Sequence, residues 1–301
     1  MRLPNPANFS MKKHILHSVL FASAAFFTVL PASAQTPPPK VEFPAASPAA
    51  TVKQRVGLTD IEISYSRPSA KGRKIFGGLV SYDKIWRTGA NSSTKIKFST
   101  EVKLGDATIA AGNYEIFTIP GKKEWTVIIH KDSSQWGAYK YDAKNDVARL
   151  TVAPVKLAAP VESFTIEIGD LRDSSATLSL NWEKTSVPVK ITTDVVTPLV
   201  PQIEALMSSD AEKKPYANAA MFYLENGLDL KKAAAWMDAA IAAQPSAAHL
   251  IHRKARILAA SGDKAGAIAT AEASLAAAQK AGGAIGEEYT KLNQDLISSL
   301  K

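Results

Sequence analysis

The sequence predicts an α+β protein with segregated domains, in which an antiparallel β-sandwich is followed by an all-α array of helical hairpins. Up to about residue 195, short segments alternate apolar and polar residues, which is the pattern of strands with one buried face. Residues 196–301 contain 27 alanines, and alanine favours helices over all other structures. The length of 301 residues is sufficient for two domains.

The N-terminus has the pattern of a secretory signal peptide. The basic residues Lys12 and Lys13 follow Met11, an apolar stretch covers residues 15–30, and Ala32 and Ala34 form an A-x-A cleavage site. The apolar stretch is too short for the alternative, a transmembrane anchor. We therefore predict a signal peptide over residues 1–34, with Met11 as the initiator, and an exported chain in the periplasm or outside the cell. No transmembrane segment is expected after cleavage.

A proline-rich linker is expected between the signal peptide and the first domain. Residues 35–50 contain five prolines among alanine and serine. Proline removes a backbone donor and fixes φ, so this composition is typical of an extended linker.

Residues 51–195 are predicted to form the β-sandwich domain, with nine or ten strands. Alternating or short apolar segments occur at 61–65, 96–98, 126–129, 164–168, 178–182 and 189–191. Turn signals separate them at Gly105-Asp106, Gly112-Asn113, Pro120-Gly121 and Gly169-Asp170. No segment with helical periodicity lies between the strands, which favours antiparallel pairing.

Residues 196–301 are predicted to form the helical domain. Helices are expected at 200–208, 211–226, 230–243, 247–260, 264–281 and 285–299. A 34-residue period relates Asp229 to Asp263 and Ala233 to Ala267. This period, with small residues where helices cross, resembles tetratricopeptide repeats. An unrelated helical bundle is the alternative. Repeat arrays present a concave surface, so a protein or peptide partner is expected here.

Composition excludes several classes of chemistry. Because the chain has no cysteine, disulfides, thiolate metal sites and cysteine nucleophiles are excluded. Removal of residues 1–34 takes away three cationic residues and no acid, which lowers the net charge from +8 to +5. With no dense basic run, nucleic acid is not an expected partner. The sequence has no phosphate-binding loop and no H-E-x-x-H motif, so no cofactor, metal or catalytic residue is predicted.

The three histidines that follow the signal peptide are expected to be structural. His130, next to Asp132 and Ser133, could form a Ser–His–Asp set, but no nucleophile elbow accompanies it. His249 and His252 have a helical spacing that could hold a metal. A solvated helix face is the favoured interpretation, because no third ligand lies nearby.

The segment 64–93 is the strongest candidate for a ligand site. It has six cationic residues, one acid and several aromatic residues. Arginine beside tryptophan and tyrosine suits a carboxylate, a phosphate or a sugar. The alternative is an internally paired cluster that closes one end of the sandwich.

Two further groups could act on sugars. Paired carboxylates of a glycoside hydrolase could come from five strand or near-strand acids: Asp60, Glu62, Glu115, Glu124 and Asp146. A stacking platform could come from four aromatic residues: Trp125, Trp136, Tyr139 and Tyr141. A place in the sandwich core is the alternative for these aromatic residues.

Several strings resemble the bacterial secreted family called domain of unknown function 2911. They include residues 54–69, Trp86-Arg-Thr-Gly-Ala-Asn91 and Trp136-Gly-Ala-Tyr139, and the resemblance covers about residues 45–195. It implies an exported β-domain, often followed by helical repeats, and brings no established activity. Its motif residues are the candidate ligand-binding residues: Tyr65, Arg67, Lys71, Arg73, Trp86, Arg87, Asn91, Trp136 and Tyr139.

We therefore expect a non-catalytic envelope binding or scaffold protein. The β-domain would hold an anionic or glycan ligand, and the helical tail would hold a partner. The alternative is a hydrolase that acts on envelope glycans or phosphoesters.

Overall fold

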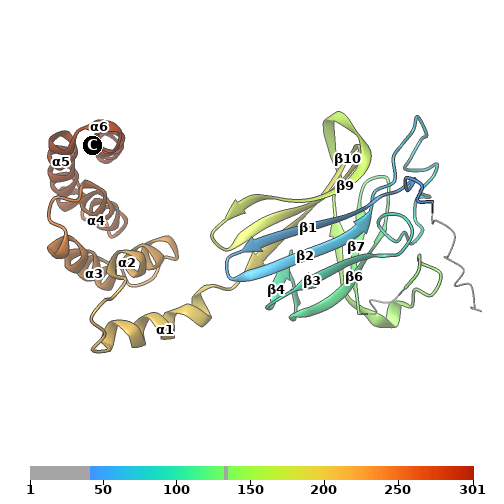
Figure 1. Ribbon diagram of the computed structural model, residues 1–301, viewed down its shortest axis with the longest axis horizontal. Helices are drawn as coiled ribbons and strands as arrows, with labels where there is room; N and C mark the ends of the chain where they lie inside the picture. The colour runs from blue at the N-terminus through green and yellow to red at the C-terminus, as the bar shows by residue number, and fades with distance from the viewer. Residues whose placement is uncertain (1–40, 132–134) are drawn as a thin grey trace, which may run out of the picture. The chain divides into compact units, whose positions relative to one another are not determined.

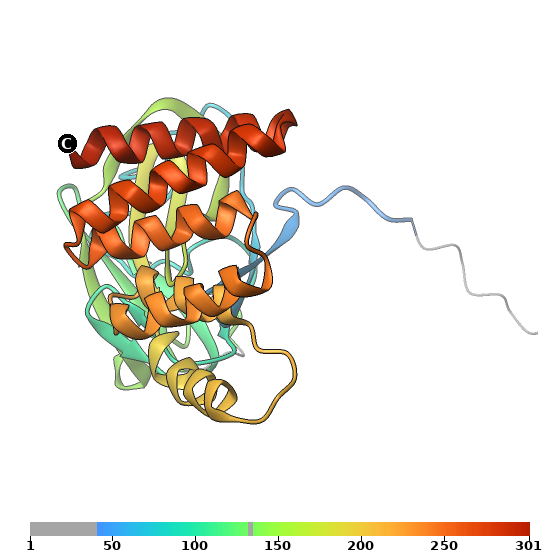
Figure 2. The same ribbon diagram turned by 90° about the vertical axis from the view of Figure 1, so that its left-hand side faces the viewer.

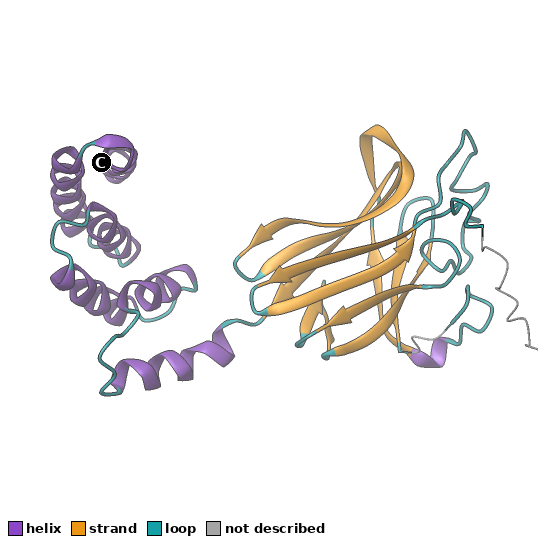
Figure 3. Cartoon of the chain, viewed as in Figure 1, coloured by secondary structure: helices purple, strands orange, loops and turns teal. Residues whose placement is uncertain are grey.

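The computed structural model describes residues 41–131 and 135–301. The predicted signal peptide and residues 35–40 of the predicted linker lie outside this range, as do Asp132 and Ser133. All strands of the described residues precede the six α-helices (Figure 3). The predicted α+β class with segregated strands and helices is therefore confirmed.

Ten described strands form two antiparallel sheets (Figure 1). They are β1 (Ala49–Val56), β2 (Thr59–Ser66), β3 (Thr94–Phe98), β4 (Val102–Leu104), β5 (Ala107–Ile109), β6 (Gly112–Ile119), β7 (Trp125–His130), β8 (Asp146–Val152), β9 (Val155–Arg172) and β10 (Ser175–Thr193). The six-stranded sheet has the order β1-β2-β3-β6-β7-β8, and the four-stranded sheet has the order β5-β4-β10-β9. A single 3-10 turn, Ala143–Asn145, precedes β8.

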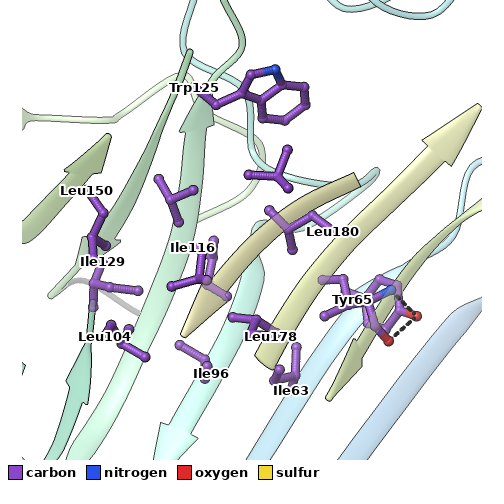
Figure 4. Packing of buried hydrophobic residues seen from close by; sticks show 14 of the residues in the cluster. Ile63, Tyr65, Ile96, Leu104, Ile116, Trp125, Ile129, Leu150, Leu178 and Leu180 are labelled. Atoms are coloured by element: carbon purple, nitrogen blue, oxygen red, sulfur yellow. Dashed lines mark hydrogen bonds between the residues drawn. The ribbon is translucent and has the colours of Figure 1, made fainter. Parts of the chain in front are cut away.

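The sandwich core follows the two-residue period of the sequence. Along β2, Ile61, Ile63 and Tyr65 are buried, and the residues between them are half-buried. Ile96, Ile116 and Ile129 continue this face across the six-stranded sheet and pack with Leu178 and Leu180 of β10 in one cluster (Figure 4). Burial of these branched side chains between two sheets is the main stabilising contribution to this domain.

The turn predicted at Gly169-Asp170 is wrong. The chain reverses at residues 173 and 174, and Gly169 and Asp170 lie within β9. Gly169 pairs with Thr177 and Arg172 pairs with Ser175, so β9 carries one extra residue between the two pairs. Asp170 has φ of 48° at this bulge. The Gly-Asp signal therefore marks a β-bulge, which needs the same left-handed conformation as a turn.

Six helices follow β10 in the described chain. They are α1 (Val196–Ser208), α2 (Tyr216–Glu225), α3 (Leu230–Ala243), α4 (Ala248–Ala260), α5 (Lys264–Ala281) and α6 (Gly283–Leu300). α1 begins four residues earlier than predicted, because Oδ1 of Asp194 accepts from the backbone N–H groups of Val196 and Thr197. α2 begins five residues later, because Pro215 restricts the residue before it. Within the described residues, no helix is long and apolar enough to cross a membrane.

The 34-residue repeat corresponds to two helical hairpins, α2–α3 and α4–α5. Asp229 and Asp263 are the N-caps of α3 and α5, and both side chains accept from backbone N–H groups of the first turn. Ala233 and Ala267 are fully buried, which allows close helix packing. Each of α2 to α5 packs against the next helix, and α4 also contacts α2 and α6. Figure 2 shows α4, α5 and α6 side by side.

The expectation of a solvated face is wrong for His252, which is buried between α4, α5 and α6. Its Nδ1 lies 2.8 Å from Oδ1 of Asn293. Nδ2 of Asn293 donates to Oγ of Ser274, and this hydroxyl donates to the carbonyl of Ala248. The buried polar groups of three helices therefore satisfy one another.

Burial lowers the pKa of His252 below its usual value of 6.5; Arg256 and Arg253 also lower it, and the hydrogen bond to Asn293 opposes them. Because the unfolded chain then binds the proton more readily, the full stability is present above about pH 6.5 and falls as the pH drops below it.

We expect the melting temperature of the full chain, followed at 222 nm, to shift downward between pH 7.5 and 5.0. In H252Q this shift should be smaller. An H249Q control should keep it, and equal pH profiles for wild type and H252Q would contradict the assignment.

Candidate functional site

The segment 67–93 crosses from β2 to β3 and carries most of the candidate ligand-binding residues. Two of its arginines bind backbone groups. Arg67 donates from Nε to the carbonyl of Phe164 at 3.0 Å, and from Nη2 to Oγ1 of Thr165 at 2.7 Å. Arg73 donates to the carbonyls of Ala70 and Ser69. These hydrogen bonds fasten the segment to β9 and to itself, and they occupy two of the five N–H donors of each guanidinium group.

Two aromatic candidates lie in the sandwich core. Tyr65 is 6% exposed, and its hydroxyl accepts from the backbone N–H of Ile166 at 2.9 Å. Trp86 is 9% exposed and stacks on Trp182 with a ring separation of 5.9 Å, and its Nε1 donates to the carbonyl of Gly89. Both side chains therefore satisfy their polar atoms inside the fold.

The remaining candidates of the crossover segment are more accessible. Lys71 is exposed and has φ of 49°, and its backbone N–H donates to Glu162. Arg87 is half-buried, and its buried Nε has no partner among the described residues. Asn91 is exposed, with φ of 58°, and its Nδ2 donates to Oγ of Ser66 at 3.2 Å.

Trp136 and Tyr139 are the exposed aromatic residues among the nine candidates. Their exposed fractions are 66% and 85%, although large aromatic side chains are usually well covered. A backbone bridge pairs Trp136 with Ser92, so Asn91 lies one residue from this pairing. Gly137 between the aromatic residues has φ of 71°, and a Cβ there would lie 2.7 Å from the Tyr139 ring. The turn thus needs glycine. We call Asn91, Trp136 and Tyr139 the aromatic platform.

A buried carboxyl group holds the aromatic platform on the six-stranded sheet. Glu115 of β6 is fully buried on the outer face of this sheet. Its Oε1 accepts from Oγ of Ser93 at 2.5 Å and from the backbone N–H of Gln135 at 3.0 Å, and its Oε2 accepts from Nε2 of Gln135 at 3.1 Å. Ser93 and Gln135 are the chain neighbours of Ser92 and Trp136. Glu115 therefore joins the two segments that present the platform.

His130 completes this buried support. Its Nε2 lies 3.1 Å from the carbonyl oxygen of Asp142, which can only accept, so Nε2 donates this hydrogen bond. Nδ1 lies 3.4 Å from Nε2 of Gln135 and 3.7 Å from Oε2 of Glu115. The histidine ring also packs edge-on against Phe117. Because His130 is fully buried among these groups, its role here is structural.

The crossover segment and the aromatic platform both lie within a stretch of sequence that matches a known family. Residues 47–191 match the family model described as protein of unknown function (DUF2911). This segment is a DUF2911 domain. No curated protein and no solved structure matches the chain in the corresponding searches.

Most other acids and aromatic residues proposed for the DUF2911 domain have internal partners. Three acids lie in ion pairs: Asp60 with Arg55, Glu62 with Lys53, and Asp146 with Arg149. Trp125 is in the core, and the Tyr141 hydroxyl donates to Asp146. Burial and this carboxylate raise the pKa of Tyr141 above its usual value, while Arg149 lowers it.

The supporting role of Ser93 and Gln135 is not evident from the sequence of the DUF2911 domain. Neither residue stands out by type, and their shared contact with Glu115 joins segments far apart in the chain. One signal does point to this region. Glu115 is the one charged residue of β6 and lies between Tyr114 and Ile116, and a charged side chain is seldom fully buried unless it has partners.

Proposed function

We propose that the protein is exported and acts as a non-catalytic binding or scaffold protein of the bacterial envelope. The DUF2911 domain would bind a glycan on the aromatic platform, and the helical domain would bind a protein partner. The observation that carries the proposal is the exposure of Trp136 and Tyr139 on a turn held by buried hydrogen bonds.

The chemistry of the aromatic platform suits a sugar ring better than an anion. Exposed indole and phenol rings offer flat apolar faces on which the C–H groups of a sugar can pack. The amide nitrogen of Asn91 donates to Ser66 and Ser47, so its amide oxygen is the polar atom that could contact a sugar, one residue from the Ser92–Trp136 bridge. The cations first proposed for an anion, Arg67 and Arg73, already donate to the backbone. A turn held in place also loses little entropy when it binds.

The helical domain offers a place for an acidic peptide. A cavity of about 330 Å³ lies between the start of α2, the end of α3 and the start of α4. Lys214 and Arg253 line it together with the polar side chains of Asn218 and Gln244. Arg253 has no acidic partner among the described residues. We therefore propose this cavity as the contact point for a carboxylate of the partner.

The hydrolase alternative has less support from the geometry. Glu115 and His130, which could supply acid–base chemistry, are fully buried and cannot reach a substrate in this conformation. Three of the remaining proposed acids are in ion pairs. A hydrolase would require a different arrangement of these groups.

Replacement of Trp136 by alanine is expected to weaken glycan binding by about 30-fold, since truncation of an exposed aromatic anchor costs about 2 kcal/mol. Isothermal titration with N-acetylglucosamine trisaccharide and maltotriose measures the effect. Y139A should also weaken binding. L79A removes an exposed apolar side chain outside the platform and should bind as wild type does. Absence of binding by both sugars, or equal affinity of W136A and wild type, would contradict the proposal.

A further inference from the structure

A second cavity lies in the sandwich domain, on residues outside the aromatic platform. Its volume is about 310 Å³, at the small end of the range of ligand sites. Its lining comes from the crossover segment, the β6–β7 turn, the β8–β9 turn, the start of β9 and the middle of β10, where Thr185 pairs with Lys156. Three aromatic residues, Phe76, Tyr82 and Trp125, and three lysines, Lys122, Lys156 and Lys184, line it.

The aromatic wall of the cavity is fixed by the fold. The rings of Phe76 and Trp125 meet edge to face at 4.9 Å and are almost fully buried, so they form a rigid base. Tyr82 is held against Gly77, where φ is 78° and a Cβ would lie 2.5 Å from the tyrosine ring. Glycine at this position therefore leaves room for Tyr82 in the wall. Pro154 and Val155 extend the apolar lining.

The lysines place unneutralised positive charge next to this wall. All three are exposed, and none forms an ion pair or a side-chain hydrogen bond within the described residues. Lys156 pairs across the β9–β10 ladder with Thr185, the neighbour of Lys184. The acids Asp83, Glu124 and Glu183 are close in the chain to lining residues, and Oδ1 of Asp83 would lie 3.9 Å from a Cβ at Gly121, but none of the three lines the cavity.

We propose that this cavity binds an amphipathic anion, with a ring-sized apolar group on the aromatic wall and a phosphate or carboxylate group among the three lysines. Because the lining contains both apolar and charged side chains, neither a neutral ring nor an inorganic anion alone uses the whole site. Lysine binds phosphate as a point charge and suits such a headgroup. The site is independent of the glycan proposal, because it shares no residue with the aromatic platform.

Titration of the full chain with three probes tests the proposal: phenyl phosphate, inorganic phosphate and phenol. Phenyl phosphate should bind at least about tenfold more tightly than either of the others, since it uses both parts of the cavity. Its binding should weaken in 0.5 M salt, because exposed charges are then screened. Vesicles that contain phosphatidic acid form a second arm, which distinguishes a lipid headgroup from a free ligand.

Lysine variants locate the bound anion. K156Q and K184Q should each weaken phenyl phosphate binding about 3–10-fold. K97Q, which removes an exposed lysine from the outer face of β3, is the matched control and should not change it. Because these lysines are exposed, the variants should keep the wild-type melting temperature. Equal binding of phenyl phosphate and phenol, no binding at all, or the same loss in K97Q as in K156Q would overturn the proposal. W136A should leave the affinity unchanged, which separates this site from the aromatic platform.

Discussion

Replacement of Trp86 by alanine is expected to lower the free energy of unfolding by about 3–5 kcal/mol, the usual cost of truncating a buried tryptophan. The indole of Trp86 packs against Phe76, Phe164 and Trp182, with ring separations of 6.3, 5.2 and 5.9 Å. Its removal leaves a cavity between the two sheets and also leaves the carbonyl of Gly89 without the indole donor. Urea denaturation followed by tryptophan fluorescence measures the change.

The matched control for W86A is W136A, in which a tryptophan of the same motif is removed from the surface. We expect W136A to change the free energy of unfolding by less than about 0.5 kcal/mol, since exposed substitutions seldom cost more. The pair therefore separates two roles within one family motif, one in packing and one in binding. If W86A were as stable as W136A, the aromatic cluster would not be the structural centre of the sandwich.

The features that could be predicted from the sequence are those that depend on local pattern. The alternation of Ile61, Ile63 and Tyr65 indicates a strand with one buried face, because side chains of a strand point to opposite sides in turn. The helix starts predicted at residues 230 and 264 have an equally local origin, since each follows an aspartate, and an aspartate N-cap needs only the N–H groups of the next turn. Both predictions agree with the structure.

The features that could not be predicted depend on contacts between distant segments. Arg67 and Arg73 have the composition of an anion site, but residue type does not tell whether a guanidinium group binds a ligand or a backbone carbonyl. In the structure Arg67 reaches β9, nearly one hundred residues away in the chain. The burial of His252 likewise depends on Asn293 and Ser274 of two other helices.

Glu115 illustrates the same difficulty on the outer face of a sheet. Its neighbours Tyr114 and Ile116 face the core, so alternation alone places its side chain in water. The structure covers this face with the segment that contains Gln135, and Glu115 is fully buried. A strand pattern describes one sheet and cannot show which loop folds over it.

Replacement of Glu115 by alanine is expected to lower the free energy of unfolding by about 3 kcal/mol. The backbone N–H and the side-chain amide of Gln135 would lose their acceptors, and each buried unsatisfied donor costs about 1–3 kcal/mol. The hydroxyl of Ser93 would still have an acceptor, because it also lies 3.0 Å from the carbonyl oxygen of Gln135. E115Q keeps the shape of the side chain and one accepting oxygen, so it should lower the free energy of unfolding about half as much as E115A does.

The same variants test whether the aromatic platform depends on its buried support. Because Glu115 holds Gln135, the neighbour of Trp136, E115A should weaken glycan binding even under conditions where the protein remains folded. Titration at 15 °C, with folding checked by circular dichroism, measures this effect. D60N, which removes an exposed acid from an ion pair on β2, should change neither stability nor binding appreciably. If E115A bound sugar as tightly as wild type, the turn would keep its shape without the carboxyl group. Gly137 and the backbone bridge to Ser92 would then be what holds Trp136 and Tyr139 in place.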